Sequence, residues 1–255
     1  LRSIEATASE LMVTNPGEAE RFYGNRIVAG NTSWIKAGEW EARRSPALVK
    51  PRTPVCLGFD GSVTNDWTGI RAETFDFYQF TPTYHNGDRE TTWNPQEWGG
   101  KIPRLEVSAA FEEIMSEFDV RRVYVDPFGW GTELDEWSAK YGKEIFVEWR
   151  TNRTGLMWEE LERFRMDVLK PDTTFTHDGN DTAAIHIRNA VEKAIGAFGR
   201  YYIEKPTEHQ KIALAMSSVL AHSAVCDALA DGAGQVVDSM IFTGTSTSAS
   251  YYGKR

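Results

Sequence analysis

Apolar and polar positions along the chain first predict three strands. Residues 55–59 form an apolar run that ends in Asp60 and a Gly-Ser pair, which predicts a buried strand followed by a sharp turn. Residues 67–74 and 75–84 are rich in Thr, Phe, Tyr and Ile and predict two more strands. The Asn-Gly pair at 86–87 supplies a turn after them. We therefore expect these strands to form an antiparallel meander.

Downstream of the meander, the apolar spacing changes between the helical and the strand period. The predicted helices cover 105–118, 132–141, 156–168, 185–198 and 209–230, and the predicted strands cover 121–126, 144–149, 175–179 and 201–203. Three antiparallel strands followed by alternating helices and strands are typical of a mixed α/β sheet with helices on its faces.

The regions on either side of this core differ from it in pattern. Residues 1–53 are interpreted as an N-terminal arm or linker, with a predicted helix at 16–28. Residues 54–232 form the predicted core domain, and 233–255, which are rich in Ser, Thr and Gly, form a predicted flexible tail. Because the chain opens with Leu1 and not Met, we expect it to be a piece of a longer protein.

Composition narrows the class of protein. The 255 residues are 41% hydrophobic and 25% charged, as in ordinary globular domains, and the formal net charge is −9. This charge argues against a passive nucleic-acid coat but is compatible with a nuclease that has an acidic metal site. No apolar run of about 18 residues stands out, so we expect no membrane partner. Cys56 and Cys226 lie in apolar contexts and are interpreted as buried free thiols.

Two acids stand at the ends of apolar strands, Asp60 and Asp126. In a mixed sheet of this order, strand 55–60 is expected to lie beside strand 121–126, which would bring the two carboxylates together. Two neighbouring carboxylates repel each other unless a cation lies between them. Mg²⁺ or Mn²⁺ needs few protein ligands, and a two-ion site suits phosphodiester hydrolysis. The pattern therefore favours a metal site over two acids that only cap turns.

The same residues permit a second interpretation. Asp60-Gly61-Ser62 also resembles the phosphate loop of actin-like and sugar-kinase ATPases. That function requires a second phosphate loop and an adenosine-binding Gly-Gly segment, and Gly99-Gly100 lies in the wrong place for it. A Walker A motif is also absent from the sequence. An ATPase of this class stays open as an alternative.

Five stretches of the chain, in this order and at this spacing, match the pattern of one protein family. The stretches are Arg21 to Arg26, Leu57 to Ser62, Val123 to Pro127, Ile203 to Pro206 and Lys211 to Met216. Over about residues 20–232 the chain resembles the C-terminal nuclease region of the large subunit of tailed-phage terminases, the motors that cut and package DNA. The resemblance implies an RNase H-like fold and metal-dependent cleavage of double-stranded DNA. It also implies an upstream ATPase domain, the portal ring and the small terminase subunit as partners, and a location in the host cytoplasm and not in the virion.

The chain departs from the family at one position. Related chains resemble Lys-Ile-Asp where this chain has Lys211, Ile212 and Ala213, and the resemblance implies that this Asp is the third metal ligand. Alanine cannot bind a metal, so the catalytic set is Asp60, Asp126 and a third position that holds Ala213. Three explanations are open: an engineered inactivation, a shifted alignment of this helix, or a different third acid. A non-catalytic module that docks DNA or the portal is a further alternative.

Other acids are weak candidates to replace the missing ligand. Asp227 lies 14 residues further along the same predicted helix, about 21 Å away at 1.5 Å per residue. Glu208 and Asp178 are conceivable but weak substitutes. Asp66 is within sequence reach of Asp60 but is interpreted as a turn residue, as are His177 and Asp178.

The remaining histidines and the tryptophans favour structural roles. The spacing of His186, His209 and His222 does not match a metal-ligand motif, so they are interpreted as structural or exposed. Trp34 and Trp40 are expected to pack on the main body. Trp93, Trp98 and Trp130 fall in predicted loops, where packing is favoured over contact with DNA.

Overall fold

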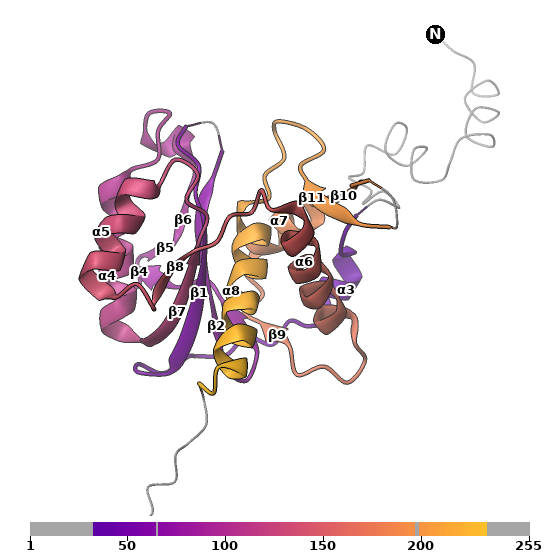
Figure 1. The fold of residues 1–255 in the computed structure, drawn as a ribbon, viewed down its shortest axis with the longest axis horizontal. Helices are drawn as coiled ribbons and strands as arrows, with labels where there is room; N and C mark the ends of the chain where they lie inside the picture. Colours follow the sequence, from indigo (N-terminus) through magenta and orange to yellow (C-terminus); the bar gives the residue numbers. More distant parts are fainter. Residues whose placement is uncertain (1–32, 65, 197–198, 234–255) are drawn as a thin grey trace, which may run out of the picture.

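A computed structural model describes residues 33–64, 66–196 and 199–233 of the chain (Figure 1). Its centre is a mixed sheet with the order β8-β7-β1-β2-β3-β9, and β6 pairs with β2. These strands are β1 (Pro54–Asp60), β2 (Thr68–Thr74), β3 (Tyr78–Phe80), β6 (Thr92–Trp93), β7 (Asp119–Val125), β8 (Phe146–Glu148) and β9 (Thr176–His177). Strands β1, β2 and β3 are antiparallel, whereas β7 is parallel to β1 and β8 is parallel to β7. The predicted meander and mixed sheet are therefore confirmed.

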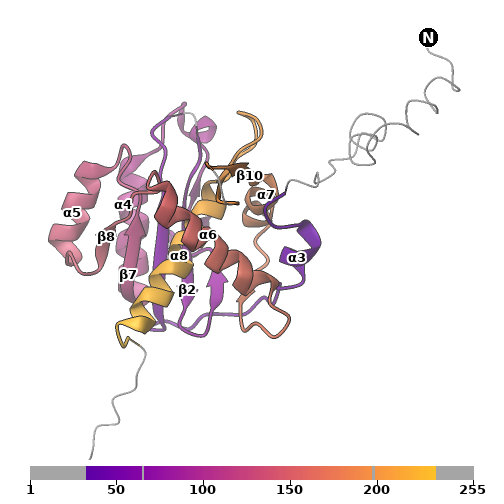
Figure 2. The ribbon, with the colours of Figure 1, turned by 45° about the vertical axis from the view of Figure 1, so that its right-hand side comes forward.

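Helices cover both faces of the sheet (Figures 1 and 2). One face carries α4 (Arg104–Glu117) and α5 (Gly131–Tyr141), and the other carries α6 (Thr154–Leu169) and α8 (Ala213–Ala230). Further helices are α3 (Ala37–Glu41), η1 (Pro95–Trp98) and α7 (Asp181–Asn189). Two small hairpins complete the described part: β4 (Thr83–Tyr84) with β5 (Arg89–Glu90), and β10 (Val191–Ala194) with β11 (Tyr201–Glu204).

Alternate side chains of β1 contribute to the hydrophobic cores on the two faces of the sheet. Val55, Leu57 and Phe59 belong to the hydrophobic core on the α4 and α5 face. Cys56 faces the opposite core, which includes residues of α8. Because successive side chains of a strand point to opposite faces, one apolar run can fill both layers. This explains why β1 is almost continuously apolar and lies inside the sheet.

The described part of the predicted arm packs against the main body. Trp34 and Trp40 are 1% exposed and share a core with Phe164 of α6. The Trp34 and Phe164 rings are stacked with centroids 5.7 Å apart. The packing expected for both tryptophans is confirmed. The predicted helix at 16–28 and all but the first residue of the predicted tail lie outside the described residues, and the domain boundaries stay a prediction.

The predicted helix at 185–198 is wrong in its second half. Helix α7 ends at Asn189, and Val191 to Ala194 form β10, which pairs antiparallel with β11. The partner strand begins only at Tyr201. Helical spacing of the apolar residues could not reveal this pairing, because the backbone hydrogen bonds that stabilise the hairpin are not encoded in the local period.

Helix α8 begins at Ala213, four residues later than predicted, and is buried along most of its length. By length and composition it also meets the requirements for a membrane span, which the sequence analysis did not recognise. However, 72% of that window is buried inside the structure, and a core helix passes the same test. The strand predicted at 75–84 is divided into β3 and β4, which belong to different sheets. The other predicted helices and strands are present with shifts of a few residues at their ends.

Candidate metal site at the ends of two parallel strands

The sheet places Asp60 and Asp126 at the same edge. Asp60 is the last residue of β1, and Asp126 directly follows β7. The strands pair in parallel with Phe59 opposite Val125, and the Asp126 N–H donates to the Phe59 carbonyl oxygen at 3.2 Å. The expected pairing of these two strands is thus confirmed, and each acid directly follows a residue of the last register pair.

The electrostatics of this edge disfavour two negative charges. Desolvation raises the pKa of Asp60 well above its usual range, and the charges of Asp126 and Asp66 raise it further. Asp126 is oriented by two donors: the Thr151 hydroxyl donates to one carboxylate oxygen, and the Phe128 N–H donates to the other at 3.3 Å. Neither Asp60 nor Asp126 makes an ion pair within the described residues. A cation placed between them would relieve the repulsion.

Position 213 lies next to this edge through the packing of α8 on β2. The Ser217 hydroxyl oxygen lies 2.9 Å from the carbonyl oxygen of Ala213 and 2.8 Å from that of Gly69, and these two acceptors share its single proton. Gly69 is the register partner of Asp60. The first turn of α8 therefore begins about one helical turn from the residue opposite Asp60. Ala213 itself is 3% exposed, and its side chain provides no ligand atom.

Asp66 forms ion pairs with two lysines from the segment before α8. Lys205 Nζ lies 2.7 Å from one carboxylate oxygen of Asp66, and Lys211 Nζ lies 3.4 Å from the other. The acid also accepts from the Trp67 N–H at 2.9 Å, which is the turn role expected from the sequence. What the sequence did not show is the pair of lysines, which come from 139 and 145 residues downstream in the chain.

The other acids considered as substitutes have separate partners. Asp178 forms an ion pair with the buried Arg71 at 3.0 Å and accepts from the Thr81 N–H at 2.7 Å. Asp227 accepts from the Tyr124 hydroxyl at 2.6 Å and pairs with Arg163 at 3.3 Å. Glu208 pairs with Lys205 at 3.1 Å and its side chain is 84% exposed. These contacts explain each acid structurally.

His177 and the loop tryptophans have structural roles, as the sequence favoured. His177 is buried, and its Nε2 lies 2.9 Å from the carbonyl oxygen of Trp40. Trp93 and Trp130 are buried in the core on the α4 and α5 face, and Trp98 packs against that core from a half-buried position. Cys56 and Cys226 are free thiols, as expected, although Cys226 is only half-buried.

His222 was expected to be structural or exposed, but its buried charge pairing was not predicted. His222 of α8 is fully buried between Glu73 of β2, at 2.7 Å, and Asp167 of α6, at 3.0 Å. Burial opposes its charge, but the carboxylates outweigh burial and raise the pKa of His222 well above its usual value. The sequence signal for this pairing was Glu73, which lies inside the fully buried strand β2. A buried carboxylate requires a partner, so a cationic side chain was to be expected beside it.

The donor set fits a hard divalent cation with two protein ligands. Among the described residues, no group of three or more His, Cys, Asp or Glu side chains is arranged to hold a metal ion. Mg²⁺, however, is commonly bound through one or two carboxylates and keeps several waters. Asp60 and Asp126, with the raised pKa of Asp60, meet this lower requirement.

The amino-acid sequence is similar to proteins of two phages. No family model matches the chain. The chain is 27% identical to the Gene 13 proteins of mycobacterium phages L5 and D29, over 89% and 86% of its own length. It spans only 39% and 37% of those two proteins.

Solved structures extend this comparison. The large terminase nuclease of thermophilic phage G20c matches with a TM-score of 0.56 and 13% identity, covering 75% of this chain and 98% of that one. The large terminase of bacteriophage HK97 matches with a TM-score of 0.54 and 16% identity, covering 86% of this chain and 50% of that one. The mixed sheet with its flanking helices is thus an RNase H-like fold, and the chain has the fold of the nuclease domains of phage large terminases.

Proposed function

We propose that this chain is the nuclease domain of a phage terminase large subunit, which hydrolyses phosphodiester bonds of double-stranded DNA during genome packaging. The observation that carries the proposal is the pair Asp60 and Asp126 at the ends of two neighbouring parallel strands, with the pKa of Asp60 raised by desolvation and by neighbouring charge. A divalent cation would stabilise two carboxylates in this electrostatic state.

Asp60 and Asp126 would hold Mg²⁺ or Mn²⁺. When bound, two such ions would activate the attacking water and stabilise the leaving oxygen. The protein's own part is to fix the carboxylates: β1 and β7 set their spacing, and the Thr151 hydroxyl and the Phe128 N–H orient Asp126. The G20c nuclease has been solved with bound magnesium and with bound cobalt, which supports a divalent cation here.

The partners follow from the same proposal. The chain covers about half of the HK97 large terminase and about half of a large terminase from a thermophilic bacteriophage, and the latter was solved in complex with ATP-γ-S. We infer that the parent protein carries an ATPase domain outside this chain and works with the portal ring and the small terminase subunit. Such a motor would act in the host cytoplasm and would not be part of the virion. With a net charge of −9, the domain would depend on the motor to present the DNA.

Alanine at position 213 is expected to lower the DNA-cleavage activity of the chain. Because the described residues offer two carboxylates and not three, the chain is expected to cleave weakly or not at all. The Ala213→Asp variant adds a carboxylate at the first turn of α8, next to the strand that pairs with β1. An acid there also lies near the positive end of the helix dipole, which offsets part of the cost of burying a carboxylate at a position that is 3% exposed.

The test is plasmid cleavage in Mg²⁺ and in Mn²⁺ by the chain, by Ala213→Asp, and by Ala213→Asp combined with Asp60→Asn. Cleavage by Ala213→Asp alone would support the proposal and identify position 213 as the third ligand position. Cleavage that persists in the double variant would refute the assignment of Asp60. If every protein is folded by circular dichroism and none cleaves, the isolated domain is not a nuclease, and a docking module for DNA or the portal becomes the better account.

A further inference from the structure

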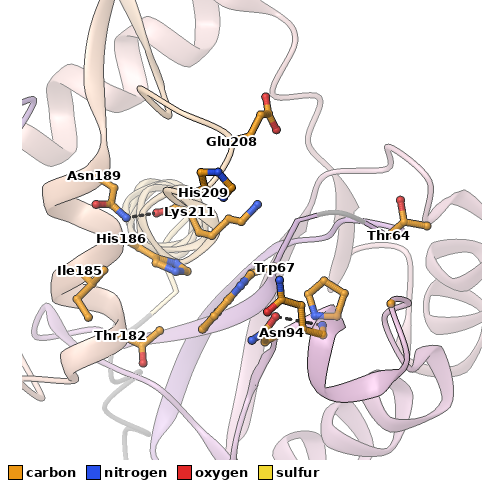
Figure 3. A pocket seen from close by; sticks show the side chains of 13 residues that line it. Thr64, Trp67, Asn94, Thr182, Ile185, His186, Asn189, Glu208, His209 and Lys211 are labelled. Carbon is orange, nitrogen blue, oxygen red and sulfur yellow. Dashed lines mark hydrogen bonds between the residues drawn. The ribbon is translucent and has the colours of Figure 1, made fainter.

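A pocket of about 690 Å³ opens between the entry to β2, η1 and α7 (Figure 3). Its walls come from four segments of the chain: the segment that enters β2, η1 with the residues on either side of it, α7, and the loop that precedes α8. The volume lies in the range of about 300–1,000 Å³ that is typical of sites for small organic ligands. Neither the two carboxylates nor position 213 line it. The pocket is therefore distinct from the metal site.

His186 gives the pocket a defined hydrogen-bond donor. The residue is 2% exposed, and its Nδ1 accepts from the Leu214 N–H at 3.0 Å. An accepting Nδ1 places the ring proton on Nε2 in the neutral imidazole. Burial lowers the pKa of His186 to about 4, so the ring is neutral at pH 7. Within the described part of the chain, Nε2 has no hydrogen-bond partner, and the ring lines the pocket (Figure 3).

The remaining walls combine flat apolar surface with polar groups. Trp67 contacts His186 edge to face, with ring centroids 5.2 Å apart. Ile185 on α7 is 45% exposed although it is a large apolar side chain. Gln96 and Thr182 add amide and hydroxyl groups. An aromatic ring, an aliphatic side chain and a few donors and acceptors suit a heterocyclic base better than a bare anion.

The pocket is connected to the candidate metal site through one charged contact. Lys211 lines the pocket and pairs with Asp66 at 3.4 Å, and the Asp66 N–H donates to the hydroxyl of Ser62, two residues after Asp60, at 3.2 Å. A nucleic-acid strand whose phosphate lies over Asp60 and Asp126 would thus have its neighbouring nucleotide close to this opening. A paired base stacked inside a duplex cannot enter such a pocket, so the occupant must be unpaired.

We propose that the pocket binds one unpaired nucleotide of the DNA strand, adjacent to the phosphate that is cleaved. The base lies against Trp67 and Ile185 and accepts a hydrogen bond from Nε2 of His186. The placement of this nucleotide beside the cleaved phosphate rests on the proposed nuclease function. The ability of the pocket to bind a base does not.

The test uses the 255-residue chain without divalent metal, titrated with dAMP, deoxyadenosine, inorganic phosphate and a short single-stranded oligonucleotide by ligand-observed NMR. We expect saturable binding of dAMP and deoxyadenosine but not of phosphate. In Ile185→Glu, which places a carboxylate in the pocket, we expect the Kd for dAMP and for the oligonucleotide to rise about tenfold or more. Leu156→Glu is the matched control, because Leu156 is 49% exposed on α6, outside the pocket, and should leave both Kd values unchanged.

Other outcomes would overturn the proposal. These are the absence of nucleotide binding, competition by inorganic phosphate as effective as that of dAMP, or equal losses in Ile185→Glu and Leu156→Glu. A loss for dAMP but not for the oligonucleotide would indicate a site for free nucleotides and would overturn the assignment to the strand. Cleavage without nucleotide binding would refute the pocket alone. Nucleotide binding with no cleavage by Ala213→Asp would refute the nuclease and the adjacency but keep the base site.

Discussion

Gly58 lies where α8 crosses β1, and its lack of a side chain allows the two elements to touch. A Cβ added at Gly58 would lie 2.1 Å from the carbonyl oxygen of Ser217 and 2.4 Å from the backbone nitrogen of Ala221. Both atoms belong to the backbone of α8, so no side-chain rotation can relieve the clash. Restoring ordinary contact requires α8 to move away by about 1 Å, which loosens its packing against the sheet. We expect Gly58→Ala to lower the free energy of unfolding by about 3 kcal/mol, at the upper end for overpacked cores.

The measurement is urea unfolding followed by circular dichroism, with two controls. Gly69→Ala meets the movable end of the Leu214 side chain at 2.3 Å and should cost about 1 kcal/mol. Gly155→Ala in α6 meets nothing within 4 Å and should be neutral or stabilising, by up to about 1 kcal/mol. Because α8 carries position 213, Gly58→Ala should also reduce cleavage in the Ala213→Asp background. A Gly58→Ala protein as stable as the unchanged chain would refute the close packing of α8 on β1.

Three further predictions concern charged groups. Asp60→Asn removes the repulsion with Asp126, so it should raise the Tm in the absence of metal. Millimolar Mg²⁺ should raise the Tm of the unchanged chain more than that of the variant. Equal responses to Mg²⁺ would contradict the cation site. Asp178→Asn leaves the fully buried Arg71 without its charge partner and should cost about 3–5 kcal/mol in urea unfolding, whereas Asp172→Asn, at an 81% exposed side chain, should change little. His222 has a folded pKa above its unfolded value of about 6.5, so its stabilisation is present below about pH 6.5 and is lost as the pH rises through the folded pKa. The free energy of unfolding should therefore fall as the pH rises above about 6.5 and through the folded pKa of His222, by up to about 1.4 kcal/mol per pH unit, and His222→Gln should show a smaller slope.

The sequence was sufficient for the sheet order around the candidate metal site. Apolar runs ending in Asp60 and Asp126, with a meander after the first, predicted that β1 and β7 are neighbours, and the register confirms it. The same reasoning placed the last helix at 209–230, close to its position in the structure, where it begins at Ala213. The metal role of the two acids stays a prediction, because the sheet brings them to one edge but does not by itself identify the ion.

Other features required contacts between distant segments. The hairpin of β10 and β11, the lysines that hold Asp66 and the burial of His222 between Glu73 and Asp167 each join residues that local patterns do not connect. Local periodicity cannot encode such contacts, because it reports only which face of one element is apolar. The pocket beside Asp66 is of the same kind, since four separate segments form its walls.

The sequence by itself determined the elements and the acids at their ends, because strand and helix periods and turn residues are local properties of the chain. Only the tertiary structure decided which charges meet and what surrounds them. Desolvation at Asp60, the ion pairs of Asp66 and the neutral ring of His186 all depend on the dielectric environment and on partners that the folded chain brings within a few ångströms.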